Sequence, residues 1–470
     1  MSFALSTSFD PSRVFIEQRT NVTGRWDPFY HRPELVALEK RVCEVTSQQL
    51  RDFVLGMAGG ATPSTKEAEE HYDTTAEAGV PFIRVQNLSI TGELNLEDIK
   101  LITRSTHEGL LKRSQLKGGE LLVKITGVGR MAVASVVPEG FEGNINQHIV
   151  AIRTDSIETS RALAAYLNLD FAEKLASRRA TGGTRPALDY PALLSIPIIF
   201  DKRIPKMLQK ALEHHKEKIC QAKSLLASID DLLLTKLGIL DPPEQPNTLD
   251  SRIFQRRLSE LSGNRFDPIA NQEKRKRLKE AIHDANCPVV PLRELIHMSK
   301  VLVKEISEGD TYVGLENVSG ETGDFIPTND KDSVSTAVKF QQGQILFPKL
   351  RPYLNKTHLA EFDGLCSTEF HVFNTKIVSP DYLTHFLRSR VIVGITSLLM
   401  TGNTLPRLQI EDILKLPIPQ PSPETQKKIC SEISAIRTQA RSLRAQAQAD
   451  FEQAKQEIEA MTLGNPTETA

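Results

Sequence analysis

The sequence has no excess of charge of either sign, few cysteines and no long apolar run. Its 58 lysines and arginines face 59 aspartates and glutamates, for a formal net charge of −1. Nucleic-acid-binding proteins usually show a basic excess, so DNA binding here would need basic residues gathered locally. The best apolar run, residues 391–400, is shorter than the roughly 18 residues that span a membrane, and the N-terminus lacks the cationic start of a signal peptide. We therefore expect a soluble, cytoplasmic protein.

The five cysteines lie far apart and form no C-x-x-C pair. Such an odd, dispersed set indicates neither a disulfide framework nor a zinc site. We expect reduced thiols and no metal ion. The cysteines are Cys43, Cys220, Cys287, Cys366 and Cys430.

Four sequence blocks occur twice, in the same order in both halves of the chain. The offset between copies falls steadily, as differing loop insertions would produce, and four collinear matches indicate an internal duplication. The pairs are Arg25-Trp26-Asp27-Pro28 with Arg265-Phe266-Asp267-Pro268 (offset 240), PFIRVQNLSITGEL with TYVGLENVSGETGDF (Asn87 and Asn317, 230), LKGGELLVKITGVGR with FQQGQILFPKLRPYL (Gly119 and Gly343, 224), and GGTRPALDYPALLSIPI with GNTLPRLQIEDILKLPI (Thr184 and Thr404, 220).

A long helix with heptad character ends each repeat. From Leu208 to Leu233 near-apolar residues follow a 4-3 spacing, with His215 as the one polar position, and a similar seam runs from Ile429 to Met461. Ser422, Pro423 and an acid in the first turn are typical of a helix start. The predicted boundaries are 1–203 for the first repeated domain, 204–238 for its helix, 239–250 for a proline-rich linker, 251–421 for the second domain, 422–463 for its helix and 464–470 for a tail.

Short β-rich runs between Gly/Asn turns predict an α/β fold for each repeat: GELLVKI, MAVASVV, HIVAIR, GQILF and FHVFN. We expect two similar mixed α/β domains separated by an antiparallel two-helix coiled coil, with pseudo-two-fold symmetry. About 30 helical residues span roughly 45 Å. Since one face of a DNA duplex recurs every 34–36 Å, two readers on such a rod could address two DNA segments.

The duplicated blocks and the long helix after each resemble the DNA specificity subunit of type I restriction–modification systems. The resemblance lies in the G-x-(L/I)-L strand blocks and the G-x-T loop with its downstream I-P-I strand, and covers roughly residues 20–463. It implies two target-recognition domains that each read half of a split DNA sequence, and a helical spacer that sets the gap. It also implies that two adenine-N6 methyltransferase subunits, which hold S-adenosylmethionine, dock on the spacer, with restriction subunits outside them.

Basic residues near glycines or an aromatic are the candidates for DNA contact, since such segments can grip phosphates and reach base edges. Incidental charge on a hairpin tip remains an equal alternative for any one of them, and a shared structural turn is favoured for the G-x-T loops. The candidates are Lys124, Arg130, Arg178, Arg179, Thr184 and Arg185 in the first repeat and Lys349, Arg351, Tyr353, Lys356, Thr404 and Arg407 in the second.

The helical seams are the candidates for partner binding. His215 could be a core histidine or could face a partner, and the core reading is favoured. The predicted partner-binding positions are Leu208, Leu212, Ile219, Leu226, Ile429, Ile433, Ile436 and Leu443.

No enzyme motif is complete. Asp27-Pro28-Phe29-Tyr30 resembles the tetrapeptide with which adenine methyltransferases hold the target amine, but its repeat reads Asp267-Pro268-Ile269-Ala270, and a turn that starts a helix explains both copies. There is no phosphate-binding loop, and Gly127-Val128-Gly129 lacks the rest of a dinucleotide fingerprint. We expect a non-catalytic chain without its own cofactor. A coiled-coil scaffold that binds no DNA and a self-sufficient methyltransferase remain the alternatives.

Overall fold

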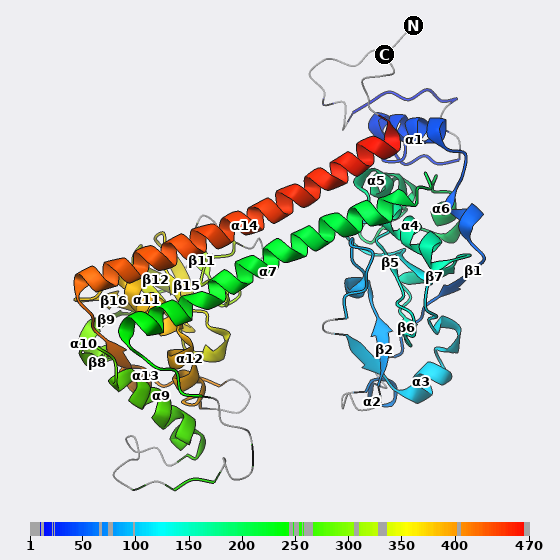
Figure 1. The fold of residues 1–470 in the computed structure, drawn as a ribbon. Coiled ribbons are helices and arrows are strands. Elements are labelled where there is room, and N and C mark those ends of the chain that lie inside the picture. The colour runs from blue at the N-terminus through cyan, green and yellow to red at the C-terminus, as the bar shows by residue number, and fades with distance from the viewer. Residues whose placement is uncertain are drawn as a thin grey trace. The chain divides into compact units, whose positions relative to one another are not determined.

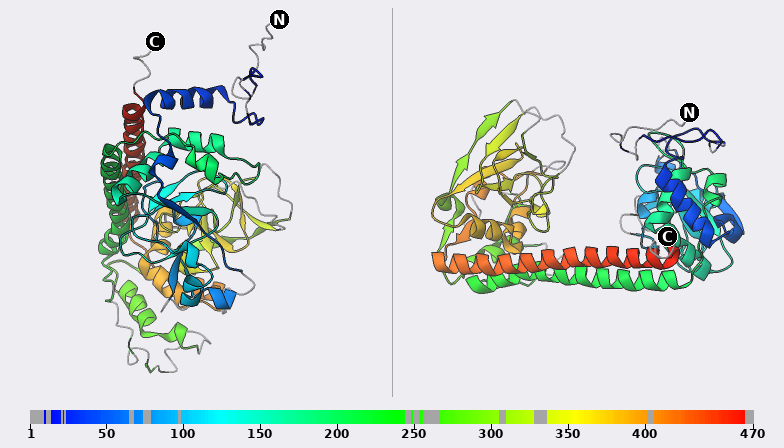
Figure 2. Two further views of the ribbon diagram at one scale, coloured as in Figure 1. Left: turned by 90° about the vertical axis from the view of Figure 1, so that its right-hand side faces the viewer. Right: turned by 90° about the horizontal axis from the view of Figure 1, so that it is seen from above.

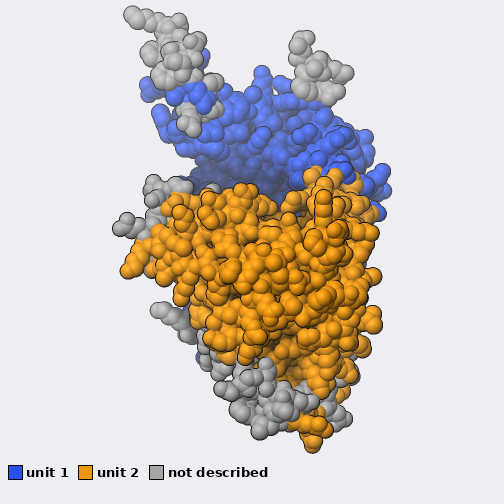
Figure 3. Space-filling model, turned by 90° about the vertical axis from the view of Figure 1, so that its left-hand side faces the viewer, with its two compact units in different colours: residues 1–217, 446–470 blue, residues 218–445 orange. Residues whose placement is uncertain are grey.

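The computed structural model describes residues 10, 14–20, 22, 24–64, 68–73, 79–96, 99–243, 248, 253–255, 257, 267–304, 310–327, 336–401 and 406–464. The chain divides into two compact units, residues 1–217 with 446–470 and residues 218–445 (Figure 3). Each unit therefore combines a lobe with parts of both long helices, which differs from boundaries drawn at the helix ends. We call the described residues from 24 to 202 the first lobe and those from 267 to 422 the second lobe.

The first lobe is mixed α/β (Figure 1). One antiparallel sheet has the strand order β1-β7-β4-β5, and a second sheet has the order β3-β2-β6, in which β2 and β6 are parallel. Helix α4 packs on β4 and β5, and the hydroxyl of Ser156 accepts from the amide of Thr159 to cap its start. The elements are α1 (Pro33–Val45), β1 (Gly56–Gly59), α2 (Ala68–His71), β2 (Val80–Ile83), β3 (Lys100–Ile102), α3 (Arg104–Glu108), β4 (Leu121–Lys124), β5 (Ala134–Val136), β6 (Asn144–Ile145), β7 (Ile149–Arg153), α4 (Ile157–Leu167), α5 (Asp170–Arg179) and α6 (Tyr190–Leu194).

The second lobe is also mixed α/β. Its described strands form sheets in the orders β10-β12-β15-β11, β14-β13-β16-β9 and β17-β8. Ser379 caps α11 by accepting from the amide of Tyr382. The elements are α9 (Glu273–His283), β8 (Val289–Pro291), α10 (Leu292–Leu295), β9 (Ile296–Ser299), β10 (Val301–Val303), β11 (Tyr312–Val313), β12 (Ala337–Phe340), β13 (Ile345–Pro348), β14 (His358–Leu359), β15 (Gly364–Ser367), β16 (Phe370–Thr375), α11 (Pro380–Arg388), α12 (Arg390–Ser397), α13 (Ile410–Ile413) and β17 (Pro417–Pro419).

The sequence correctly predicted strands in five segments, since each of them overlaps one of β4, β5, β7, β13 or β16. The two predicted long helices are α7 (Arg203–Leu237) and α14 (Pro423–Leu463). The hydroxyl of Ser422 accepts from the amide of Thr425, which confirms the predicted start of α14. Within the described residues, no helix has the length and apolar content that a membrane crossing requires.

The repeated blocks make the same local hydrogen bonds in both lobes. The Asp27 carboxylate accepts from the amide of Tyr30, and the Asp267 carboxylate accepts from that of Ala270, so each copy is a turn before a helical segment, as predicted. The two aspartates are 240 residues apart in the sequence, and so are the two residues that donate to them. This is the offset read from the first repeated block.

Asn87 and Asn317 each close a loop. The Asn87 side chain accepts from the amide of Arg84 (2.9 Å) and donates to the carbonyl of Asn95 (3.0 Å). The Asn317 side chain accepts from the amide of Gly314 (2.8 Å) and donates to the carbonyl of Ile326 (3.1 Å). Gly119 and Gly343 both adopt positive φ (85° and 82°), which favours glycine over other residues. The second and third blocks therefore also have matching local structures.

In unit 1 the start of α7 and the end of α14 lie side by side and run in opposite directions (Figures 1 and 2). The His215 ring meets the edge of Phe451 with ring centroids 5.6 Å apart, and neither imidazole nitrogen has a hydrogen-bond partner among the described residues. This favours the core reading of His215. In unit 2, Lys236 of α7 pairs with Glu432 of α14 at 2.9 Å.

The paired asparagines generate a stability prediction. Asn87→Ala and Asn317→Ala should each lower the free energy of unfolding by about 1–3 kcal/mol, because each removes two hydrogen bonds made by a buried side chain. Urea denaturation followed by circular dichroism measures both. The exposed Gln342→Ala is the control and should change stability by less than about 0.5 kcal/mol. Equal stability of all three variants would contradict this account of the loops.

Candidate nucleic-acid interface

In the first lobe the structure brings two of the predicted DNA-contacting segments together. Residues 126–130 follow β4, and residues 181–187 follow α5. The amide of Gly127 donates to the carbonyl of Pro186 (3.0 Å), and Thr126 and Thr181 both form β-bridges with Ala187. We call these two segments the first tip. Val128 at its end is 76% exposed.

The second lobe has an equivalent second tip, made of residues 350–356 with the described residues 401, 406 and 407. The amide of Arg351 donates to the carbonyl of Pro406 (3.2 Å), and Leu350 and Thr401 both bridge to Arg407. These partners match those of the first tip at offsets of 224 and 220. The two lobes therefore use the same backbone frame to hold different side chains.

Arg351 occupies the place that Gly127 holds in the first tip. Its φ of 47° lies in the left-handed region, as does that of Asn355 (52°), and the two residues flank the short turn Pro352–Leu354. A non-glycine residue in this region costs roughly 1–2 kcal/mol. Such outliers occur often at functional sites, so the strain at Arg351 marks it as a functional candidate.

Four predicted residues are exposed at the tips. Thr184 and Arg185 extend from the first tip, and Arg351 and Tyr353, which is 47% exposed, extend from the second. Among the described residues no side-chain hydrogen bond or ion pair holds Arg185 or Arg351. Exposed guanidinium groups of this kind can reach phosphates or pair with guanine in the major groove. Thr404 lies outside the described residues.

Three further predicted residues, two in the second tip and Lys349 just before it, are partly engaged. The Lys349 ammonium donates to the carbonyl of Thr368 (2.6 Å), and the Lys356 ammonium donates to that of Val318 (2.5 Å). Arg407 pairs with Glu369 at 2.7 Å, and this hydrogen bond lowers the pKa of the Glu369 carboxyl. Their contacts with a ligand would have to compete with these internal partners.

Lys124 supports the first tip from inside. It is only 4% exposed, and its ammonium donates to the carbonyls of Val128 (2.8 Å) and Arg130 (2.9 Å). Burial lowers its pKa, with Glu173 opposing the shift. Lys124 therefore shapes the tip and does not extend from it, so DNA contact is not proposed for it.

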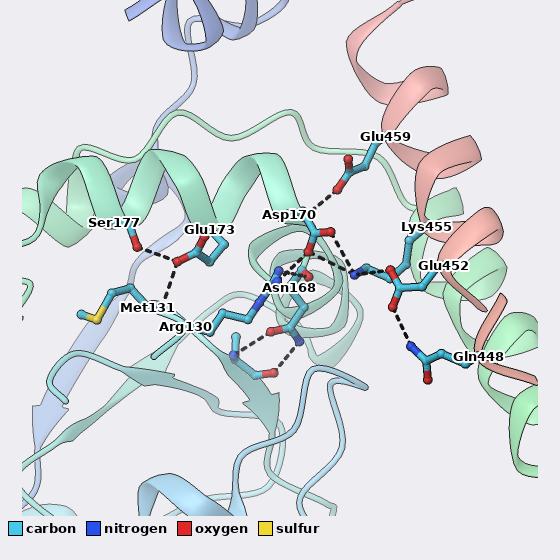
Figure 4. Close-up of polar contacts among 11 residues, drawn as sticks. Arg130, Met131, Asn168, Asp170, Glu173, Ser177, Gln448, Glu452, Lys455 and Glu459 are labelled. Atoms are coloured by element: carbon cyan, nitrogen blue, oxygen red, sulfur yellow. Dashed lines mark hydrogen bonds and ion pairs between the residues drawn. The ribbon is translucent and has the colours of Figure 1, made fainter. Parts of the chain in front are cut away.

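Arg130 is held by the first lobe (Figure 4). Its guanidinium donates to the Asp170 carboxylate and to the carbonyl of Asn168, both at 2.5 Å. Burial alone would raise the pKa of Asp170, but hydrogen bonds from Arg130 and Lys455 outweigh it and hold this pKa below its ordinary value. This arginine is a structural cation.

Arg178 and Arg179 are likewise structural, against the expectation of a basic DNA-contacting loop. Both are 7% exposed and pair with the carboxylate of Glu39 in α1. Arg178 also lies over the Tyr30 ring, 4.2 Å from its centroid. If either arginine turned away to bind a phosphate, the Glu39 carboxylate would lose a paired cation. DNA contact is therefore not proposed for either arginine.

Two residues that the sequence did not suggest as candidates for the interface, Lys300 and His371, lie near Lys349. Burial, helped by the charges of Lys349 and Lys300, lowers the pKa of His371 to about 4, so its ring is neutral at pH 7. Exposed apolar side chains of β9 and β10 lie in the same stretch of chain, including Met298 (42%) and Val301 (54%). In the sequence HMSKVLVK, basic residues are interleaved with apolar ones, and this pattern could have indicated Lys300 as a candidate.

The predicted partner-binding seam is largely internal. Leu208, Ile429 and Ile433 are buried in the cores of their units. The remaining five positions are partly buried: Leu212, Ile219, Leu226, Ile436 and Leu443. A partner would therefore have to use the outward sides of the helices. Among the described residues no cluster of His, Cys, Asp or Glu could hold a metal ion.

The chain resembles the DNA specificity subunits of type I restriction–modification systems, and comparison with curated proteins confirms the resemblance read from the repeated blocks. A segment of 122 residues is 26% identical to the type I restriction enzyme EcoDI specificity subunit of Escherichia coli. The match spans 26% of this chain and about a quarter (27%) of that relative. No family model matches the chain.

Two solved structures similar to this chain are an HsdS subunit from Thermoanaerobacter tengcongensis and a type I restriction–modification S subunit from M. genitalium. The first is 12% identical, with a TM-score of 0.34 and coverage of 88% of this chain and 94% of that one. The second is 11% identical, with a TM-score of 0.34 and coverage of 89% and 94%.

The internal role of Lys124 can be tested directly. Lys124→Met should lower the free energy of unfolding by about 1–3 kcal/mol, because two carbonyls of the first tip lose their donor. Lys117→Met, at an exposed position close in sequence, is the control and should change little. Urea denaturation measures both variants, and a Lys124→Met protein as stable as the control would refute the assignment.

Proposed function

We propose that the chain is the non-catalytic DNA-specificity subunit of a type I restriction–modification complex. The observation that supports it most is the pair of equivalent tips, which share a backbone frame and carry different exposed side chains. One frame with two sets of side chains suits a protein that reads two different half-sites, because side chains at base edges carry the sequence information.

In this proposal the two lobes arose by duplication, and α7 and α14 form the spacer between them. DNA contact is assigned first to the exposed residues Thr184, Arg185, Arg351 and Tyr353. Lys349, Lys356 and Arg407 contribute where they exchange their internal partners, and Lys300 adds positive charge near the second tip. Thr404 remains a proposed contact from the sequence alone.

The proposed protein partners are two methyltransferase subunits, which supply S-adenosylmethionine and methylate adenine at N6, and restriction subunits that join through them. A groove in unit 1 supports docking on the helices. Both α7 and α14 line it, and Met207 on its edge is 37% exposed. Partly exposed methionines adapt to a partner's surface. The complex would act in the cytoplasm, where it meets incoming DNA.

The experiment is a binding assay with the chain in complex with its methyltransferase partner and a randomised DNA library. Enrichment of a split sequence, with affinity that falls as salt rises, is the expected result. A complex that retains no DNA would favour the alternative, a coiled-coil scaffold. Heat of S-adenosylmethionine binding to the isolated chain would instead favour a self-sufficient methyltransferase.

The exposed arginines give a sharper test. Arg185→Ala and Arg351→Gly should each weaken specific DNA binding roughly 5- to 100-fold and, where the lost contact is to a phosphate, reduce the salt slope by about 1. Arg351→Gly should preserve or raise stability, because glycine relieves the left-handed strain. Fluorescence anisotropy and thermal denaturation give the two readouts.

Lys117→Ala, at an exposed position of the first lobe, is the matched control, since it removes a positive charge outside the tips and outside the helices proposed for docking. It should leave specific affinity within about twofold, given the small worth of isolated surface charges. If the control weakened binding as much as the tip variants, the tips would not be the DNA-contacting surface.

A further inference from the structure

In unit 1, α5 begins against α14 (Figure 4). The backbone amide of Asp170, the first residue of α5, donates to the Glu459 carboxylate (2.6 Å). The Asp170 carboxylate accepts from the Lys455 ammonium at 3.0 and 3.2 Å. We call this contact the first joint. In its side-chain ion pair the lobe contributes the acid, Asp170, and the helix contributes the base, Lys455.

In unit 2, α12 begins against α7. The backbone amide of Arg390, the first residue of α12, donates to the Asp230 carboxylate (3.0 Å). The Arg390 guanidinium pairs with Asp231 (2.7 Å) and with Asp241 (2.5 Å). We call this contact the second joint. Here the lobe contributes the base, and the helix and the chain after it contribute the acids.

The two joints are equivalent positions of the repeat. Asp170 and Arg390 differ by 220, the offset of the last repeated block. Each starts a helix after a single extended residue, Leu169 or Ser389, and each backbone amide is capped by a carboxylate from a long helix. Burial raises the pKa of both capping carboxyls, Glu459 and Asp230. Only the side-chain ion pair is reversed in polarity.

We propose that this reversed polarity prevents like repeats of two chains from pairing. The inference rests on the duplicated architecture of the proposed function. In the chain, the start of α5 in the first lobe meets α14, and the start of α12 in the second lobe meets α7. If two copies paired like with like, the first lobe of one copy would meet α7 of the other, and the second lobe would meet α14.

Each like pairing brings equal charges together. Asp170 of one copy would face Asp231 of the other in place of Lys455, and Arg390 would face Lys455 in place of Asp231. The caps stay carboxylates, because Asp230 and Glu459 exchange places. Lys455 is only 6% exposed, so water would screen that repulsion weakly. Like charges in contact are an effective device against a wrong partner. The excluded partner is a second copy of this chain.

The test gives both joints the same polarity while keeping an ion pair in each. The full-length triple variant R390D/D231K/D241N copies the first joint into the second, with an acid in the first turn of α12, where the helix dipole favours it. Like pairing then becomes attractive at both joints. After refolding from urea, size-exclusion chromatography with light scattering should show a dimer fraction several times that of the natural chain at equal concentration.

R390K preserves polarity and is the matched control, which should refold as the natural chain does. The neutral variant R390Q/D231N/D241N should give an intermediate dimer fraction, and it provides a second test if the triple variant folds poorly. The natural chain needs no mutation for a third test. Refolding in 1 M NaCl, where the Debye length is about 3 Å, should raise its dimer fraction relative to 0.05 M NaCl.

Dimer fractions of the polarity and neutral variants no higher than that of R390K would overturn the proposal. An equal dimer fraction of the natural chain at both salt concentrations would also contradict it. Because the readout is the mass of the refolded protein and involves no DNA, its failure is distinguishable from failure of the proposed function, which would appear as a loss of split-sequence binding by the natural complex.

Discussion

Each lobe completes its hydrophobic core with side chains from a helix that follows the other lobe in the sequence. Phe451 and Ile458 of α14 belong to the core of unit 1, and Leu233 and Leu237 of α7 belong to that of unit 2. Burying a large aliphatic or aromatic side chain stabilises by about 1.5–3 kcal/mol. Neither core is therefore complete until a helix from a distant part of the sequence has packed against it. The rest of the structure depends on this packing of α14 in unit 1 and of α7 in unit 2.

Much of the fold could be predicted from the sequence because the duplication records it twice. The turns at Asp27 and Asp267 and the loops closed by Asn87 and Asn317 depend on side chains that bond to nearby backbone, so their pattern is local. The strand segments and the heptad spacing are local signals as well. The candidate interface was harder to predict, since the basic segment SRRATGGTR gives no sign that Glu39 holds Arg178 and Arg179.

Long-range contacts decide which basic residues remain at the surface. Lys124 at the end of β4 was a candidate for DNA contact, as was Lys349 just after β13. The Lys124 side chain, however, points into the first tip and holds two carbonyls there. Arg351, by contrast, replaces a glycine of the first repeat and is exposed in a left-handed conformation. With near-zero net charge, the chain can bind DNA under the proposed function only through such small exposed groups and its partners' surfaces.

Under the proposed function, this chain selects the DNA sequence and its partners carry out the chemistry. The most direct test replaces residues 1–203 by the first lobe of another specificity subunit. N6-methyladenine is then mapped across the genome of cells that carry the whole system. The account predicts a two-part methylated motif in which only one half changes after the exchange. An unchanged motif, or a change in both halves, in cells that still methylate would contradict it.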